Sequence, residues 1–432
     1  MRSDRPRAPE AAQLKRDYAW NAAASVSGSL ALVVMLAVVN RAAGIEALGL
    51  YSLAIGIGQL FQTLGMYEVR AYHVTDVGHR FSFGTYLATR LVTVALMVLG
   101  IIANALWVSP TASTALLVIM VACLRVFDAL EDVFLAEFQR AGRLDLGGRA
   151  ATVRTAVTVG VFCLALALTR DLAASALVAL PVSAAVMLLA FLPPARGLFA
   201  CQPQWRARAI VGVLVQCLPL FVASFLAMYL VNAPRYAIAA HLDLRAQGCF
   251  AIIYMPAVTI NLLSLLVFRP LLTPMAVHWA RGELAAFTGR IHRGLATTGV
   301  AFLVVAAVAW PLGPWILEAV LGQDVRPLRA ELMVLVAGGA LNAAAVILYY
   351  ALTTMRRQRL VLLGYALAAA ASWALCRLLV PRSGLMGASA AYAASMGVLA
   401  AAFALCLLPA SGIARGRVGQ RWPTRHGLSR GR

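Results

Sequence analysis

Runs of about twenty predominantly apolar residues recur along the whole chain, separated by short polar segments. An α-helix needs about 20 such residues to cross the hydrocarbon core of a membrane. The runs predict twelve spanning helices, which we place near 19–39, 47–67, 84–105, 113–136, 149–168, 173–192, 210–231, 248–268, 294–317, 328–354, 360–380 and 385–408. Only 12% of the residues are charged, about half the share found in soluble domains. We therefore expect an all-α polytopic membrane protein rather than a soluble one.

The distribution of charge predicts how these helices are oriented. Most of the 37 Lys and Arg residues fall in alternate polar segments, beginning with the N-terminal tail and ending with the tail after residue 408. Short basic segments stay on the cytoplasmic side of a membrane, so both termini are predicted to be cytoplasmic. The net charge of +20 is then an orientation signal. We expect the basic N- and C-terminal tails to lie against anionic headgroups of the phospholipid bilayer. We expect no nucleic-acid partner.

The chain divides into two halves that show weak sequence similarity to each other. The run VVNRAAGIEALGLYSLAI joins the first two predicted spans, and LVNAPRYAIAAHLDLRAQGCFAII joins the seventh and eighth. Many transporters consist of two such repeats. We predict an N-terminal lobe over residues 1–192, a cytoplasmic loop between the lobes over 193–209, a C-terminal lobe over 210–408 and a basic cytoplasmic tail over 409–432.

Signatures of catalysis and of nucleotide hydrolysis are missing from the sequence. There is no G-x-x-x-x-G-K-S/T, H-E-x-x-H or G-x-S-x-G motif. The seven Cys residues are scattered and form no C-x-x-C pair, so neither a disulfide framework nor a metal site is predicted. The polar segments are too short to hold a catalytic domain. The expected class is a carrier that works inside the membrane, without a cofactor and without enzymatic activity.

The fourth predicted span contains the stretch LRVFDALEDVFLAEFQR, which places four ionisable residues within eight positions. They are Arg125, Asp128, Glu131 and Asp132. Each residue turns a helix by about 100°, so three of them share one face and Glu131 lies beside it. Arg90 and Arg154 lie at a similar depth on the third and fifth spans. Two interpretations stay open: an ion-pair network that fastens the helices, or a hydrated cavity where the arginines bind substrate and the carboxylates couple an ion or form a gate.

Arg41 and Arg235 close the first and seventh spans at their predicted outer ends, beside Asn40 and Asn232. They either anchor the helices by reaching to lipid headgroups or face a central cavity as a pair. Arginine suits a phosphate because its planar guanidinium donates two parallel hydrogen bonds. Segment 68–84 mixes Arg, His and aromatic residues. It is interpreted as a solvated basic inner loop, or alternatively as a cytoplasmic mouth that receives an anionic headgroup.

Several runs resemble one known family. They are GLYSLAIGIGQLFQTLG followed by YEVRAYHVTD, LVNAPRYAI in the seventh span, and FRPLLTPMAVHW after the eighth. Together with twelve spans they resemble the Wzx-like polysaccharide-biosynthesis flippases of the multidrug/oligosaccharidyl-lipid/polysaccharide exporter superfamily. The resemblance implies two six-helix lobes around a central cavity that opens alternately to each side. It also implies the translocation of oligosaccharide repeat units linked to undecaprenyl diphosphate across the cytoplasmic (inner) membrane, for cell-surface polysaccharide assembly. A glycan polymerase and a chain-length regulator would then be partners.

The resemblance implies a cationic cavity, whereas the charges predicted inside the first lobe of this chain cancel. In this respect the chain departs from the family pattern. Three alternatives stay open. An ion-coupled multidrug or cation antiporter of the same superfamily would favour an acidic cavity, and no acidic residue lies within the first span. A membrane-embedded polysaccharide polymerase would carry a long outer loop rich in Arg and His, which no predicted outer loop shows. A structural membrane scaffold would need no site at all.

Overall fold

The computed structural model describes residues 8–76, 80–260, 275, 277–279 and 281–413. These residues form helices joined by short turns, and no strand occurs among them. The chain is thus an all-α protein, as the apolar runs predict. Large apolar side chains cover the outside of the helices, with Leu106 at 64% and Leu168 at 76% exposure. Such a surface fits a lipid environment and would be unfavourable in water.

The helices run as follows. The first seven are α1 (Ala8–Ala43), α2 (Ile45–Met66), α3 (Val69–Thr75), α4 (Phe83–Val108), α5 (Ala112–Arg140), α6 (Leu144–Thr169) and α7 (Leu172–Arg196). They are followed by α8 (Ala207–His241), α9 (Leu244–Ile253), α12 (Leu284–Leu321), the 3-10 turn η2 (Arg326–Leu328), α13 (Arg329–Thr354) and α14 (Gln358–Ile413).

Local signals in the sequence set several of these boundaries. Thr111 Oγ1 accepts a hydrogen bond from the N–H of Thr114, and Asp171 Oδ1 from that of Ala173, so these side chains cap α5 and α7. Short polar side chains at this position satisfy backbone donors that the first turn of a helix leaves free. Gly44, at φ 87°, separates α1 from α2. That conformation favours glycine.

Ten helices among the described residues are long and apolar enough to cross a membrane, so the protein is a multi-pass membrane protein. One of the ten, α14, supplies two of the twelve predicted spans. Its backbone leaves the helical conformation at Gly384, Arg357 Nη1 donates to the carbonyl of Cys406 at 3.1 Å, and the rings of Tyr365 and Phe403 lie 5.3 Å apart. The two halves of α14 are therefore antiparallel. The eighth predicted span, 248–268, begins in α9 and runs into 261–274, outside the described residues.

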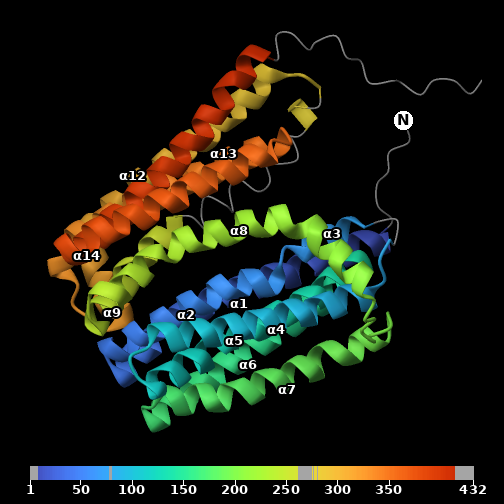
Figure 1. The fold of residues 1–432 in the computed structure, drawn as a ribbon, viewed down its shortest axis with the longest axis horizontal. Coiled ribbons are helices and arrows are strands. Elements are labelled where there is room, and N and C mark those ends of the chain that lie inside the picture. The colour runs from blue at the N-terminus through green and yellow to red at the C-terminus, as the bar shows by residue number, and fades with distance from the viewer. Residues whose placement is uncertain (1–7, 77–79, 261–274, 276, 280, 414–432) are drawn as a thin grey trace, which may run out of the picture.

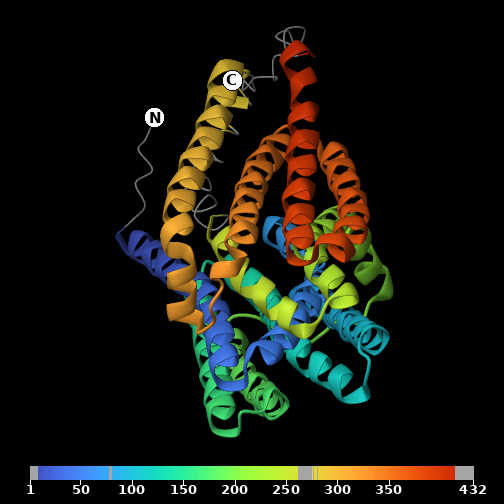
Figure 2. The same ribbon diagram turned by 90° about the vertical axis from the view of Figure 1, so that its left-hand side faces the viewer.

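The helices form two groups that meet at one end and diverge toward the other (Figure 1). Helices α1 to α7 pack on one another, and α12, α13 and α14 form the second group (Figure 2). Helix α8 packs on α2 and α4 as well as on α14. We call the end where α2 contacts α9 and α1 contacts α12 the closed end, and the end that carries α3 and both termini of the described chain the open end.

Glycines bring α2 and α9 into backbone contact at the closed end. A Cβ on Gly49 of α2 would lie 1.9 Å from the carbonyl oxygen of Leu244. A Cβ on Gly248 of α9 would lie 2.3 Å from that of Ile45. Any larger residue at either position would force the helices apart, so these glycines allow the closed end to seal.

Two sequence predictions need correction. Arg235 does not close the seventh span, because α8 continues through Pro234 to His241, and Arg235 is buried. Within segment 68–84, Val69–Thr75 is not a solvated loop but the short helix α3, and His73 in it is fully buried. In both segments, polar residues lower the hydropathy and so favour the prediction of a loop. Tertiary contacts nevertheless keep these segments helical.

Candidate functional site

Helix α5 carries the charges of the candidate site and lies in the middle of the first group. It contacts α2, α4, α6 and α7 along its length, and α3 near the open end. Its charged face therefore meets neighbouring helices on several sides instead of lipid. An ionisable side chain inside a membrane protein normally turns toward the bundle interior for this reason.

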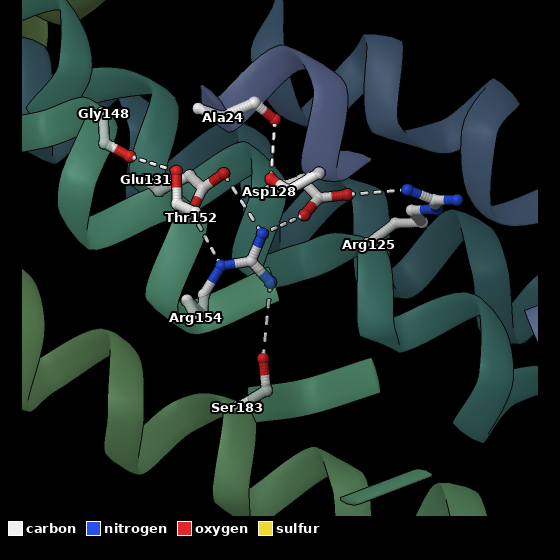
Figure 3. Close-up of polar contacts among 9 residues, drawn as sticks. Ala24, Arg125, Asp128, Glu131, Gly148, Thr152, Arg154 and Ser183 are labelled. Atoms are coloured by element: carbon white, nitrogen blue, oxygen red, sulfur yellow. Dashed lines mark hydrogen bonds and ion pairs between the residues drawn. The ribbon is translucent and has the colours of Figure 1, made fainter. Parts of the chain in front are cut away.

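Arg154 of α6 binds the carboxylates of Asp128 and Glu131 on α5 (Figure 3). Its Nε donates to Glu131 Oε2 at 2.7 Å and its Nη2 to Asp128 Oδ1 at 2.5 Å. The third nitrogen, Nη1, lies 3.5 Å from Ser183 Oγ of α7. Arg125 binds the second oxygen of Asp128 at 2.9 Å. The guanidinium of Arg154 is thus almost fully occupied by protein groups.

Asp132, about one helical turn beyond Asp128 on α5, binds two other arginines. Arg90 Nη2 of α4 donates to Asp132 Oδ2 at 2.6 Å, and Arg70 Nη1 of α3 to Oδ1 at 3.3 Å. Arg90 is fully buried and also donates to the carbonyl of Gly65 at 2.6 Å. Its role is therefore to orient Asp132 and to hold α4 against α2 and α5.

Every predicted charge on α5 is thus paired, yet the same charges line a cavity of about 340 Å³ between α1, α2, α5 and α6. The polar lining residues are Asn21, Ser25, Tyr51, Gln62, Arg70, Arg125, Asp128, Glu131, Asp132, Arg154, Thr155 and Thr158. The ion pairs of the first interpretation are therefore present beside a polar cavity, and substrate binding or ion coupling in that cavity stays a prediction. The ion pairs join the helices, and their outer surfaces face a polar cavity.

Arg70 and Arg125 differ from the two other arginines of this network. Their side chains keep 34% and 27% exposure, against 0% for Arg90 and 5% for Arg154. The Nε of Arg125 has no hydrogen-bond partner among the described residues. Four arginines against three carboxylates leave the network with one formal positive charge. The expectation that these charges cancel omitted Arg70, which the sequence placed in a loop.

A second polar group near the open end was not predicted. His73 of α3 lies 2.6 Å from Glu137 of α5, which also binds Arg140 at 2.6 Å. Just beyond α3, burial raises the pKa of Asp76, but the N–H groups of Arg80 and Phe81 and the hydroxyl of Tyr86 donate to the carboxylate, and together they lower that pKa. These contacts fasten α3 to α4 and α5.

Arg41 and Arg235 do not share a contact. Arg41 is exposed in the last turn of α1 and donates to the carbonyl of Ala319, while Asn40 donates to that of Leu321 at 2.6 Å. Both therefore tie α1 to the end of α12 at the closed end. Arg235 is buried on α8, where it donates to Asn232.

Metal binding finds no support in the described residues, where no group of three or more His, Cys, Asp and Glu side chains is placed to hold an ion. The candidate site is therefore an arginine and carboxylate cavity. Such a cavity is suited to bind an anionic group at Arg70 and Arg125, or a cation or proton at the carboxylates.

Neither the family models nor the curated proteins give a match to this sequence. Solved structures do match its fold. The lipid II flippase MurJ in an inward closed conformation has a TM-score of 0.66 at 10% identity, over 89% of this chain and 87% of that one. An inward-facing multidrug resistance MATE family transporter of the MOP superfamily has a TM-score of 0.64 at 12% identity, over 92% and 96%.

The chain has the fold of these transporters. An outward-facing MATE family transporter matches less well, with a TM-score of 0.52 at 11% identity over 94% and 96% of the two chains. The arrangement of the helices is thus more similar to the two inward structures named above than to this outward-facing one.

Proposed function

We propose that the protein is a flippase of the MOP superfamily. It moves oligosaccharide repeat units linked to undecaprenyl diphosphate across the cytoplasmic membrane by alternating access, for cell-surface polysaccharide assembly. The open end then faces the cytoplasm, as the basic segments predict. Its partners would be the lipid-linked oligosaccharide, the bilayer, and a polymerase and chain-length regulator that use the product.

The observation that carries this proposal is the pair of partly exposed arginines, Arg70 and Arg125, which line the cavity and belong to a network of four arginines and three carboxylates. The side chain of Arg125 is 27% exposed, and among the described residues it forms an ion pair with Asp128 alone. A diphosphate presents several anionic oxygens, and a guanidinium binds such oxygens through two parallel hydrogen bonds. Arg90 and Arg154 act indirectly, because each holds carboxylates in place.

An ion-coupled antiporter of cations or drugs is the second candidate. Three buried or half-buried carboxylates line the same cavity: Asp128, Glu131 and Asp132. The MATE structures that share the fold are named as multidrug resistance transporters. Under this alternative the carboxylates would bind the cation or proton, and the arginines would only balance their charge.

The test uses purified protein in liposomes that contain a fluorescent polyprenyl-diphosphate oligosaccharide. Wild type should move the lipid between leaflets, which is measured as the fraction that an added glycosidase cleaves. A hydrogen bond to a charged group contributes about 1.5–3 kcal/mol, so Arg125→Ala should slow flipping about tenfold or more. Arg149→Ala is the matched control, since this exposed arginine of α6 lies outside the cavity.

The antiporter is tested in the same liposomes with a cationic dye and an imposed proton gradient. Dye movement without lipid movement would contradict the flippase and support the second candidate. Lipid movement that Arg125→Ala leaves intact would contradict the site but not the function.

A further inference from the structure

Arg235 is a buried arginine without a carboxylate. It is 8% exposed, donates to Asn232 Oδ1 through Nη1, and its Nε has no partner among the described residues. Its guanidinium carbon lies 5.1 Å from the ring centre of Tyr254. No ion pair of the described residues includes Arg235, and the undescribed stretch 261–274 contains no Asp or Glu.

This arginine differs from Arg90 and Arg154, the two other buried arginines among the described residues. Arg90 and Arg154 each bind a carboxylate at 2.7 Å or less. A charged side chain inside a membrane costs several kcal/mol, and proteins normally offset that cost with an opposite charge. An aromatic ring and one amide oxygen replace only part of the lost hydration. Among the described residues, the contacts of Arg235 therefore offset only part of that cost.

The surroundings of Arg235 belong to the closed end. A Cβ on Gly56 of α2 would meet Asn232 Oδ1 at 3.1 Å and Arg235 Cδ at 3.4 Å. Tyr236 of α8 donates its hydroxyl to the carbonyl of Gly56 at 2.9 Å. The contact between α2 and α8 thus covers Arg235, and the adjoining contact between α2 and α9 must separate if the closed end is to open.

We propose that Arg235 is a second anion site, which binds the diphosphate only after the closed end has opened. This inference rests on the proposed flippase function. In the present conformation the diphosphate binds near Arg70 and Arg125, while Arg235 is covered by α2. Separation of α2 from α8 and α9 exposes Arg235, and the anion supplies the opposite charge that the arginine lacks. The gain on binding there favours the opened conformation and draws the headgroup across.

The proposal predicts an unusual combination of effects. Replacing a buried charge that has no counter-charge by a similar apolar side chain relieves a cost. Arg235→Met should therefore unfold at the same temperature as wild type or higher, and yet flip the lipid at least tenfold more slowly. Arg235→Lys keeps the charge but loses the two-pronged contact, so it should be intermediate in flipping. A merely structural arginine would lower stability and flipping together.

The decisive experiment separates the two conformations. Glu46 of α2 and Arg245 of α9 line one pocket at the contact between these helices. In a Cys-free background, the substitutions Glu46→Cys and Arg245→Cys allow a short bismaleimide to join the two helices. This cross-link holds the closed end shut. A soluble farnesyl diphosphate analogue is the probe. In the cross-linked protein, Arg235→Met should bind it within twofold of wild type, whereas Arg125→Met should bind it at least tenfold more weakly.

The outcomes are distinct. If Arg235→Met weakens binding tenfold in the cross-linked protein, or flips the lipid at the wild-type rate, the second site does not exist. If Arg235→Met unfolds at a clearly lower temperature, Arg235 has a structural role and the proposal is again refuted. If wild type neither binds the analogue nor flips the lipid, the proposed function itself fails.

Discussion

Arg154→Met tests whether the charges of α5 are held by ion pairs. Methionine has a similar length, so the substitution removes the guanidinium while the apolar part of the side chain still packs between α5 and α7. Arg154 is 5% exposed, and it binds Glu131 at 2.7 Å and Asp128 at 2.5 Å. Asp128 keeps Arg125 as a partner at 2.9 Å. Glu131 would therefore be the carboxylate left without a cation.

Removing one partner of a buried ion pair typically costs about 3–5 kcal/mol, because the remaining charge stays buried and unpaired. We expect a loss of that size in the free energy of unfolding for Arg154→Met. Adding Glu131→Gln removes the unpaired charge, so the double variant should recover a large part of it. The structure thus predicts strong coupling between these two substitutions.

The assay is thermal unfolding of the detergent-solubilised protein, followed by its helical circular dichroism. Arg149→Met is the control, since Arg149 is exposed on the same helix. It should unfold as wild type does. If Arg154→Met also unfolds as wild type does, water solvates Glu131 and the ion pairs contribute little. If the double variant is no more stable than the single one, the unpaired carboxylate is not the cause.

Three further predictions follow from other parts of the molecule. Reporter fusions should read cytoplasmic at Ala195 and periplasmic at Asp324; the reverse pattern would refute the orientation. Gly384→Ala, at φ 57° between the halves of α14, should cost about 1–3 kcal/mol in thermal unfolding, whereas Gly160→Ala, with open space around its Cα, should not destabilise. The pKa of Asp76 is lowered on folding, so wild type should exceed Asp76→Asn in stability above about pH 5, and this advantage should shrink as the pH falls below about 4; a difference independent of pH would contradict the assignment.

The sequence predicted the architecture well because a membrane imposes simple rules. Helices that cross it must be long and apolar, and eleven of the twelve predicted spans coincide with helices of the described chain. The helical period placed Arg125, Asp128 and Asp132 on one face. Arg90 and Arg154 were predicted to lie near them because they occur at a similar depth in the membrane on the neighbouring spans. All five take part in the network, because charges inside a membrane protein usually pair with one another.

The remaining features depend on contacts that hydropathy does not encode. Arg70 belongs to the network because α3 packs against α5. The sequence of this polar segment of seven residues does not predict that packing. Arg235 is buried because Gly56 lets α2 approach α8 at the level of Asn232. Pro234 and its polar neighbours reduce the hydropathy there, so the predicted span ended too early.

The ion pairs of α5 also constrain how the chain enters the membrane during synthesis. Four ionisable residues near the middle of one helix would each cost roughly 2.5–3.5 kcal/mol if that helix inserted alone. Their partners Arg90 and Arg154 lie on α4 and α6, the helices immediately before and after it. We therefore expect α4, α5 and α6 to insert as one unit, with α5 waiting for α6 before it leaves the translocation channel. A nascent chain that ends before residue 144 should leave α5 uninserted, which glycosylation mapping of truncated chains would reveal.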